Sequence, residues 1–235
     1  MNLIVLGPAG SGKSTFVKSF SGYLKDKDYD VKSVNLDSAS DPIFEATADI
    51  REFVRAEDVM REYRLGINGA LIKSMEIAVE SIDNILVEGE FVLYDTPGQM
   101  ELFLYSKEGL RIVEKISKSL WTAGLFIVDS EIASTPENFI SILAQSAVIS
   151  LRTALPTLTV FNKVDISDFD FEIERIKEGI SEGGVLSELL EKLVVFIEHT
   201  TVPYRPVRIS SITLQGFDDV FSAINELFCS CGDIS

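Results

Sequence analysis

Hydrophobic and polar positions divide the chain into two alternating kinds of segment. Short runs are apolar almost throughout and rich in β-branched or aromatic residues, as in strands that are buried on both faces of a sheet. Longer stretches between them repeat apolar residues every three or four positions, which predicts helices. The predicted strands are Leu3–Leu6, Val31–Leu36, Phe91–Tyr94, Leu125–Val128, Thr157–Phe161 and Val207–Ile209. The predicted helices include Lys13–Leu24, Ala56–Tyr63, Gly69–Val79, Lys107–Lys118, Glu137–Leu151, Val185–Phe196 and Phe217–Phe228.

The predicted strands are separated by long, mostly helical segments. Parallel strands need a crossover of about a dozen residues or more, usually a helix, whereas antiparallel strands can be joined by short hairpins. The order of elements therefore predicts an α/β fold, with a mainly parallel β-sheet flanked by helices in three layers. No internal repeat or clear linker divides the 235 residues, so we expect a single domain over residues 1–235 with helical insertions.

Charge and composition exclude several classes of function. The chain has 21 Lys and Arg against 37 Asp and Glu, a net charge of −16, which disfavours direct binding to nucleic acid or to an anionic membrane. No apolar stretch reaches the roughly 18 residues of a membrane helix, and the N-terminal run lacks the basic leader of a signal peptide. Cys229 and Cys231 are too few for a metal site of their own. We expect a cytoplasmic protein with reduced thiols.

A glycine-rich segment carries the strongest chemical signal in the chain. Gly7–Thr15 fits the pattern G-x-x-x-x-G-K-[ST], directly after a predicted strand and before a predicted helix. In such a loop, backbone N–H groups and a helix N-terminus point at phosphate oxygens, Lys13 reaches the β- and γ-phosphates, and the Ser14 hydroxyl can ligate Mg²⁺. The expected nucleotide-binding residues of the loop are Gly10, Ser11, Gly12, Lys13, Ser14 and Thr15. The motif predicts a P-loop NTPase fold.

A second polar segment follows the predicted strand Phe91–Tyr94. Asp95 stands at the carboxyl end of this strand, where parallel α/β sheets bind their ligands, and can hold Mg²⁺ through water. Gly98 offers a backbone N–H for a γ-phosphate, and Gln99 can orient the attacking water. An ordinary strand-end turn has the same composition, so this interpretation depends on the phosphate-binding loop beside it.

A third polar segment, Asn162–Asp165, follows the predicted strand Thr157–Phe161 at the same edge of the sheet. The Asp165 carboxylate can accept both N1–H and N2–H₂ of guanine, a pair of donors that adenine lacks. Later in the chain, a Ser-Ser pair can present backbone N–H groups to guanine O6, although Ser-Ser after a strand is common loop chemistry. The expected nucleotide-binding residues of these two segments are Asn162, Lys163, Asp165, Ser210 and Ser211.

Asp37 directly follows the predicted strand Val31–Leu36. In a doubly wound sheet this position lies near the phosphates, where a carboxylate can bind Mg²⁺ through water or activate the nucleophile. The alternative is an Asp that caps the following turn. The expected metal-binding residues are Ser14, Asp37 and Asp95.

Six segments, in this order, closely resemble the GPN-loop GTPases, a branch of the P-loop GTPases. They are Gly7–Thr15, Asn35–Asp37, Asp49–Arg51, Gly66–Leu71, Asp95–Gln99 and Asn162–Asp165, and they span most of the chain. The resemblance implies Mg²⁺-dependent hydrolysis of GTP to GDP and phosphate by a homodimer, in which the loop Gly66-Ile67-Asn68 enters the partner's active site. It also implies a family insertion at about residues 49–82. The catalytic residues that it implies are Asp37, Asn68, Gln99 and Glu101.

The loop after which the family is named departs from its pattern here. Ile67 stands where the family has proline, so the restraint on φ near −65° is lost and a backbone N–H is gained. Either the loop is less preorganised, or Ile67 packs against the partner subunit. Arg51 and Arg64 are the nearby candidates for an arginine finger, and a helix-surface role is the simpler interpretation of both.

The resemblance also bears on partners. Eukaryotic members of the family are linked to RNA polymerase assembly and often carry C-terminal extensions, whereas this chain resembles a compact, archaeal-like member. A protein client, in the assembly of a complex such as RNA polymerase, is therefore implied. The segment at about residues 166–205 is longer than a simple crossover needs, and forms either a client-binding lid or a buried core helix.

Two other functions share part of this pattern. A P-loop ATPase or kinase has the phosphate-binding loop without needing Asn162–Asp165. An assembly chaperone or scaffold would use nucleotide to stabilise its dimer with negligible turnover. We expect a homodimeric GTPase switch that binds GTP, Mg²⁺ and a protein client, and we assign no catalytic role to His199, the only histidine.

Overall fold

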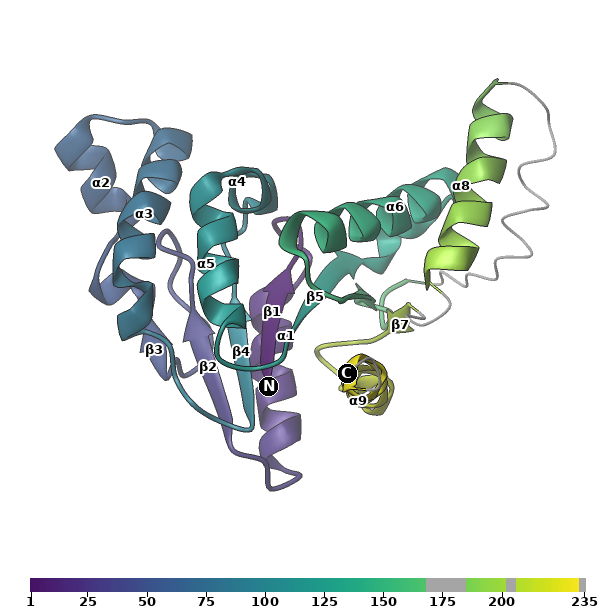
Figure 1. Ribbon diagram of the computed structural model, residues 1–235, viewed down its shortest axis with the longest axis horizontal. Coiled ribbons are helices and arrows are strands. Elements are labelled where there is room, and N and C mark those ends of the chain that lie inside the picture. Colours follow the sequence, from purple (N-terminus) through teal and green to yellow (C-terminus); the bar gives the residue numbers. More distant parts are fainter. Residues whose placement is uncertain (168–184, 202–205, 233–235) are drawn as a thin grey trace.

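The computed structural model describes residues 1–167, 185–201 and 206–232. In this part of the chain, seven strands form one sheet in the order β3-β2-β4-β1-β5-β6-β7, and all neighbouring strands are parallel (Figure 1). The carboxyl ends of the strands therefore meet at one edge of the sheet. The strands are β1 Asn2–Leu6, β2 Val31–Asn35, β3 Ala48–Asp49, β4 Phe91–Asp95, β5 Thr122–Asp129, β6 Thr157–Asn162 and β7 Val207–Arg208.

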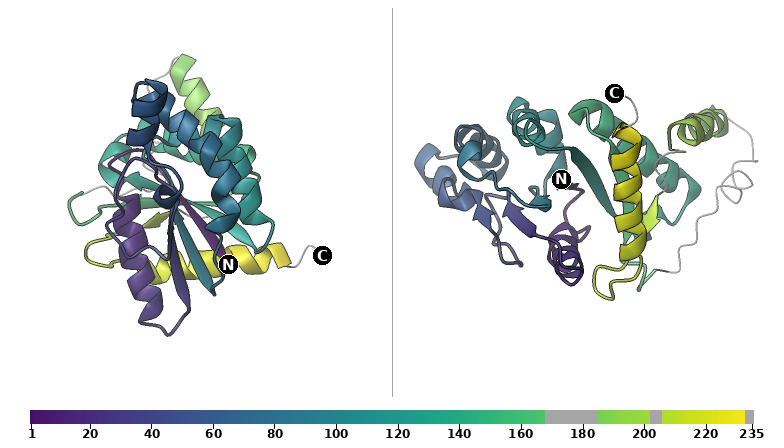
Figure 2. Two further views of the ribbon diagram at one scale, coloured as in Figure 1. Left: turned by 90° about the vertical axis from the view of Figure 1, so that its left-hand side faces the viewer. Right: turned by 60° about the horizontal axis from the view of Figure 1, so that its bottom comes forward.

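Helices cover both faces of the sheet and make three layers (Figure 2). Successive side chains of a strand point to opposite faces, so Leu3 and Val5 of β1 join one core while Ile4 and Leu6 join the other. The first face is covered by α1 Lys13–Lys25 and α9 Phe217–Gly232. The helices that contribute to the other core are α2 Ala56–Tyr63, α3 Ile67–Ser81, α4 Met100–Tyr105, α5 Lys107–Ser117, α6 Pro136–Thr153 and α8 Val185–Thr201.

An aromatic cluster anchors α1, the helix that follows the phosphate-binding loop. Phe16 and Phe20 of α1 stack with their ring centroids 5.0 Å apart, and Phe217 of α9 meets them edge-on at 5.8 and 5.3 Å. All three rings are buried. Such aromatic pairs contribute about 0.5–1.5 kcal/mol each beyond the burial of their area. The cluster therefore holds the first turns of α1, and with them the loop, against the sheet.

The strands and helices predicted from the sequence are all present, with differences at their ends. β3 and α4 are not predicted, because two residues in a strand and six in a helix are too few to show a period. The helix predicted from Gly69 begins at Ile67, after Gly66 as its N-cap residue. Asn68 therefore lies in the first turn of α3 rather than before it.

About half of the predicted lid at about residues 166–205 falls outside the described residues. Within the described part, α8 buries Leu190 and Val194 in the core that contains α6, while Leu189, Val195 and Phe196 are about half exposed. One face of α8 thus packs in the core, as the core-helix alternative predicts. No helix in the described ranges is both long enough and apolar enough to cross a membrane.

Candidate functional site

The phosphate-binding loop connects β1 to α1 at the carboxyl edge of the sheet. Gly10 and Gly12 have φ values of 80° and 93°, in the left-handed region that glycine enters without a steric penalty. The chain can therefore turn sharply into α1, whose first residue is Lys13. The Lys13 side chain is buried, and its ammonium donates hydrogen bonds to the carbonyl oxygens of Gly7 (2.9 Å) and Pro8 (3.1 Å). The loop thus combines a helix N-terminus with a fixed positive charge.

Carboxylates gather around the Lys13 ammonium. Burial lowers the pKa of Lys13, and the negative charges of Asp95, Asp37 and Glu101 raise it in part. Asp95, only 3% exposed at the end of β4, accepts a 2.6 Å hydrogen bond from the Ser14 hydroxyl through Oδ2. Its Oδ1 is buried without a hydrogen-bond partner among the described residues. Three carboxylates against one ammonium leave excess negative charge at the place where phosphates are expected.

The buried Asp95 carboxyl also makes stability depend on pH. Burial raises its pKa from 3.8 to about 6, against the opposing effects of the Ser14 hydrogen bond and the Lys13 charge. The folded state therefore holds the proton more tightly than the unfolded chain does. This contribution to stability is complete below pH 3.8 and is lost as the pH rises through about 6, because the carboxyl must then ionise in a buried place.

We expect Asp95→Asn to stabilise the nucleotide-free protein at neutral pH, because the amide keeps an acceptor for Ser14 without the buried charge. Relative to wild type, the gain should grow by on the order of 2–3 kcal/mol between pH 4 and pH 8. Urea unfolding of both proteins across this range measures the difference. A gain that does not change with pH would contradict the raised pKa.

Asn162 ties the end of β6 to the phosphate-binding loop. Its Nδ2 donates to the carbonyl oxygen of Ser11 at 3.0 Å, and its Oδ1 accepts from the N–H (3.0 Å) and the hydroxyl (2.9 Å) of Ser211. All three residues are buried. The amide of Asn162 therefore joins three segments that are far apart in the sequence, and its role is to hold them together.

Gly12 lies too close to this amide to carry a side chain. A Cβ on residue 12 would stand 2.4 Å from Nδ2 of Asn162, whereas a Cβ on Gly10 would meet no atom within 4 Å. Both residues have positive φ, so alanine is strained at either position. Gly10→Ala is thus a control for backbone strain without the steric clash.

We expect Gly12→Ala to destabilise the protein more than Gly10→Ala. The left-handed backbone costs about 1–2 kcal/mol for alanine in both variants. Gly12→Ala must also displace Asn162 and disturb its buried hydrogen bonds, which costs about 1–3 kcal/mol more. Urea unfolding of the nucleotide-free variants measures both losses. Equal losses would show that the contact between Gly12 and Asn162 carries no weight.

Lys163 is held by an acidic residue that the sequence analysis does not single out. Its ammonium pairs with Oδ2 of Asp129 at 2.6 Å, and its backbone has a φ of 68°. Asp129 ends β5 and lies opposite Asn162 in the β5–β6 register. Asp129 directly follows the predicted strand Leu125–Val128, as Asp95 follows its own strand. This position could have identified it as a candidate site residue.

A cavity of about 120 Å³ joins the phosphate-binding loop to the segment Asn162–Asp165. The described residues that line it are Gly12, Thr15, Asn162, Lys163, Asp165, Ile166, Ser211 and Ile212. Asp165 itself is exposed, so its carboxylate is accessible to a ligand. The structure therefore brings the residues predicted to bind phosphate and those predicted to bind a base to one place.

The backbone N–H groups of Ser210 and Ser211 are not free to meet a base. Ser210 donates to the carbonyl oxygen of Gln215 at 3.1 Å, and Ser211 donates to Oδ1 of Asn162 at 3.0 Å. The predicted contact from these groups to guanine O6 would have to share or replace these bonds. One N–H closes the turn after β7 and the other binds Asn162 at the end of β6, which the Ser-Ser pair alone does not reveal.

The residues predicted to position water are exposed. A Cβ on Gly98 would stand 3.8 Å from Cβ of Ala9, so the β4–α4 connection faces the phosphate-binding loop. Gln99 is the exposed N-cap residue of α4, and Glu101 is exposed in its first turn. Asn68 is exposed on α3, which packs against α2 and α5, and its side chain makes no hydrogen bond within the described part of the chain.

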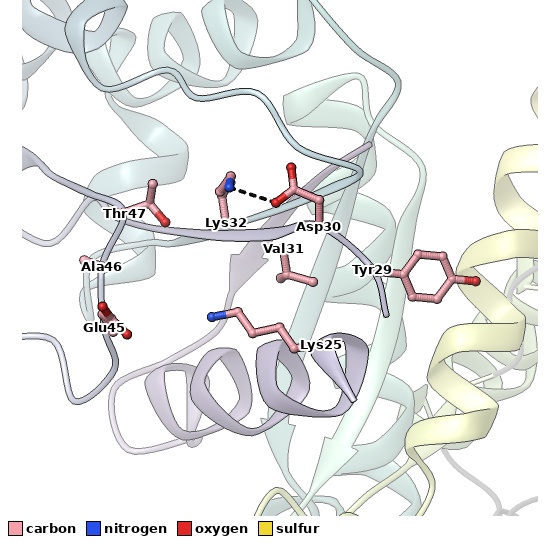
Figure 3. A pocket seen from close by; sticks show the side chains of 8 residues that line it. All are labelled: Lys25, Tyr29, Asp30, Val31, Lys32, Glu45, Ala46 and Thr47. Atoms are coloured by element: carbon pink, nitrogen blue, oxygen red, sulfur yellow. Dashed lines mark ion pairs between the residues drawn. The ribbon is translucent and has the colours of Figure 1, made fainter. Parts of the chain in front are cut away.

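A larger cavity, of about 400 Å³, lies near the amino end of β2, away from these residues (Figure 3). Lys32 and Asp30 form an ion pair of 2.8 Å on its wall, and the Lys25 side chain extends along it. Tyr29 instead points toward α9, where its ring packs against Phe221. The cavity contains none of the predicted site residues, so its size does not make it the nucleotide site.

Comparison with known proteins identifies the family and its fold. Residues 5–230 match a family model described as "Conserved hypothetical ATP binding protein". The chain is 32% identical to the "GPN-loop GTPase PAB0955" of Pyrococcus abyssi, with all of both chains covered, and 31% identical to "GPN-loop GTPase 1" of Saccharomyces cerevisiae over 95% of this chain and 65% of the yeast protein. The crystal structure of PAB0955, a GTPase in apo form, matches with a TM-score of 0.86, 30% identity and 98% coverage of each chain. The chain belongs to the GPN-loop GTPases.

In this GPN-loop GTPase, the segment Gly66-Ile67-Asn68 begins a helix and has exposed apolar residues nearby in sequence. Ile67 is the first residue of α3, the position at which proline is favoured because its φ suits the first helical turn. The helix itself therefore restrains the backbone at Ile67. The side chain is 47% exposed, and Tyr63, Leu65 and Ile72 nearby in sequence are also exposed. Ile67 thus has apolar area left for a partner.

Proposed function

We propose that this GPN-loop GTPase hydrolyses GTP to GDP and phosphate with Mg²⁺, as a homodimeric nucleotide switch. The observation that carries the proposal is the single cavity shared by Gly12 and Thr15 of the phosphate-binding loop and by Asp165. Pockets for whole ligands usually measure about 300–1,000 Å³, so a cavity of about 120 Å³ would take the base end of a nucleotide. The phosphates would lie along the loop and the N-terminus of α1.

Guanine selectivity is assigned to Asp165. Its exposed carboxylate lines the cavity and can accept two N–H donors from the guanine edge. Lys163 and Asn162 shape the same wall, since Lys163 is fixed by Asp129 and Asn162 by Ser11 and Ser211. A carboxylate that loses its contact with water and gains no donor is costly, so adenine should be rejected.

Mg²⁺ fits the donor set beside Lys13. Ser14, Asp95 and Asp37 offer oxygen ligands, which Mg²⁺ prefers. Oδ1 of Asp95 accepts no hydrogen bond within the described part of the chain and is therefore available to a ligand. Within the described ranges, no three His, Cys, Asp or Glu side chains form a ready metal cage, so phosphate and water oxygens would complete the coordination. When bound, the ion neutralises charge on the β- and γ-phosphate oxygens.

The catalytic roles follow from where charge and water must be controlled. Lys13 and the backbone N–H groups of its loop stabilise negative charge on the phosphates, while Gly98 and Gln99 approach from the β4–α4 connection. Gln99 would orient the attacking water, and Glu101 or Asp37 would accept its proton or fix it by a hydrogen bond. The negative charges of both carboxylates raise the pKa of Lys13, which supports a role for them beside this ammonium.

Asn68 would act in the active site of the partner subunit. Its side chain is exposed and makes no hydrogen bond within the described part of its own subunit. The apolar side chains of Tyr63, Leu65, Ile67 and Ile72 provide area for contact with a second copy. Mass measurement by light scattering, with Mg²⁺ and a non-hydrolysable GTP analogue, should give twice the 26.0 kDa of the chain. A monomer at micromolar concentration would contradict the dimer.

Hydrolysis of radiolabelled GTP with and without Mg²⁺ tests the proposed activity. We expect phosphate release with Mg²⁺ that is abolished by EDTA and restored by excess Mg²⁺. GDP binding should persist in EDTA with lower affinity, since the loop and Asp165 remain. GTP bound tightly with no phosphate release would instead support a scaffold that uses nucleotide only to stabilise its dimer.

ATP is the second candidate substrate, because the matching family model is described as an ATP binding protein. The phosphate-binding loop does not discriminate between the two, since it contacts only phosphates. Asp165 is the residue that favours guanine. The choice therefore depends on the base, and direct competition between GTP and ATP decides it.

We further propose a protein client, in the assembly of a complex such as RNA polymerase. A switch transmits its nucleotide state by changing its affinity for a partner. Purified Gln99→Leu protein, loaded with GTP or with GDP, can be used to capture proteins from native extract for mass spectrometry. Polymerase subunits should be enriched in one nucleotide state. Equal recovery in both states would contradict a switch.

A further inference from the structure

The side chain of Asn35 makes an unusually complete set of contacts at the end of β2. It is 1% exposed. Its Oδ1 accepts from the N–H of Asp37 at 3.0 Å, and its Nδ2 donates both to the carbonyl oxygen of Asp37 at 3.1 Å and to Oδ1 of Asp49 at 2.9 Å. Both polar main-chain groups of Asp37 are therefore held by one side chain. Asp37 also accepts the N–H of Ala39 at 2.9 Å, which orients its carboxylate.

The other end of this network is a rigid ion pair. Asn35 and Asp49 lie opposite each other in the β2–β3 register. Arg51 donates its backbone N–H to Oδ1 of Asp49 at 2.9 Å and its Nη2 to Oδ2 at 2.6 Å, and its guanidinium also pairs with Asp41. The Asp49 and Arg51 side chains are only 14% and 12% exposed. The acceptor that Asn35 uses on β3 is therefore fixed in place.

We propose that Asn35 is a positioning residue that holds Asp37 at the phosphate end of the site and joins it to the Asp49–Arg51 pair. The inference rests on the proposed function, because Asp37 must matter for Mg²⁺ or for the attacking water. Asn35 lies opposite Asp95 in the β2–β4 register, and the N–H of Leu36 donates to the carbonyl oxygen of Asp95 at 2.8 Å, so Asp37 follows directly beside Asp95 and a small displacement of its carboxylate changes the field there.

The network also has a consequence for the segment that carries Asn68. Asp49 begins the stretch of chain, through Arg51 and α2, that leads to the first turn of α3. The amide of Asn35 is thus a direct link between the Asp37 position and the start of the segment assigned to the partner's site. Breaking any of the three hydrogen bonds of this buried amide would leave a polar group unpaired, which is costly. A displacement of Asp37 should therefore move Asn35 and Asp49 with it.

Asn35→Ala tests the inference, with Asn2→Ala as the matched control. Asn2 lies at the amino end of β1, remote from the site, and is also 1% exposed. Its side chain donates a 2.9 Å hydrogen bond to the carbonyl oxygen of Ile116. Both variants should lower the urea midpoint of unfolding. Only Asn35→Ala should lower kcat, by about 10-fold or more, with the KM for GTP changed by less than about 3-fold.

Two readouts do not depend on turnover. In Asn35→Ala, the Asp37 amide should exchange with deuterium at least about 10-fold faster, because its acceptor is removed. Mg²⁺ should strengthen GDP binding, and the Mg²⁺ concentration that gives half of this effect can be measured by titration. This concentration should rise several-fold in Asn35→Ala and stay unchanged in Asn2→Ala. If Asn35→Ala matches Asn2→Ala in kcat and in Mg²⁺ dependence, the inference is wrong and Asn35 only stabilises the fold.

Further variants separate this inference from the proposed function. Asn35→Asp keeps the shape and the acceptor for the Asp37 N–H but loses both donors, so kcat should fall even if Asn35→Ala yields little folded protein. Asp37→Ala should lower kcat at least as far. If Asp37→Ala lowers kcat and neither Asn35 variant does, only the positioning role fails. If Asp37→Ala leaves kcat and Mg²⁺ dependence unchanged, the role proposed for Asp37 fails, and the positioning role with it.

Discussion

Asp165→Asn should weaken the binding of GTP and GDP by about 100-fold or more. The carboxylate is proposed to accept N1–H and N2–H₂ of guanine, and each hydrogen bond to a charged group contributes about 1.5–3 kcal/mol. Asparagine keeps one acceptor, but its NH₂ group would face the N2–H₂ donor. Xanthine has an oxygen at that position, so Asp165→Asn should bind XTP more tightly than wild type does. Calorimetric titration of both proteins with GDP and XDP measures this change of preference from guanine to xanthine.

Asp219→Asn provides the control for the change in charge. Asp219 is exposed in the first turn of α9, and its replacement alters the net charge by the same amount. Its affinities for GDP and XDP should match those of wild type. If Asp165→Asn binds the two nucleotides in the wild-type ratio, Asp165 does not read the base, and the guanine assignment has no remaining physical basis.

Gln99→Leu and Asn68→Ala should each lower kcat by about 100-fold, with GTP still bound. Both residues are proposed to place or stabilise the attacking water and the developing charge, and removing one such contact typically costs 10²–10³ in kcat. Neither is assigned to ground-state binding, so KM should change little. Gln145→Leu on α6 and Asn84→Ala after α3 are exposed replacements of the same kinds and should leave kcat unchanged. Unchanged hydrolysis in both test variants would exclude the water-positioning mechanism.

Mixing two inactive variants tests whether Asn68 acts across the dimer. In a dimer of one Asn68→Ala and one Lys13→Ala subunit, one site has an intact phosphate-binding loop and receives an intact Asn68 from its partner. After equal mixing and exchange, half of the dimers are mixed and each has one working site. About a quarter of the wild-type activity should therefore return. No recovery, with subunit exchange shown separately, would place Asn68 in its own subunit's site or outside catalysis.

The sequence was sufficient to predict the sheet and most helices, because parallel strands buried on both faces leave apolar runs that polar segments interrupt. Asp95 and Asn162 were recognisable for the same reason, since each follows such a run at the carboxyl edge. β3 and α4 were too short for a period to appear. Their existence depends on tertiary contacts, such as the pairing of Val34 and Asn35 with Ala48 and Asp49.

The connections within the site were harder to predict than its members. The motif containing Asn162 predicts nucleotide binding, and it does not reveal that this amide also joins Ser11 to Ser211. Asp129 lies outside the six segments, and Asn35 lies in one without a predicted role; their partners Lys163 and Asp49 are 34 and 14 residues away in sequence. A single sequence does not reveal such pairs, because side-chain hydrogen bonds across a sheet depend on strand order and register.

We propose that one site at the carboxyl edge of the sheet binds triphosphate, Mg²⁺ and a guanine edge together. Competition between unlabelled ATP and radiolabelled GTP for the wild-type protein is the most direct test. We expect unlabelled GTP to displace the label at a concentration at least about 100-fold lower than ATP does, because Asp165 is proposed to pair only with guanine. Equal displacement by the two nucleotides would contradict it.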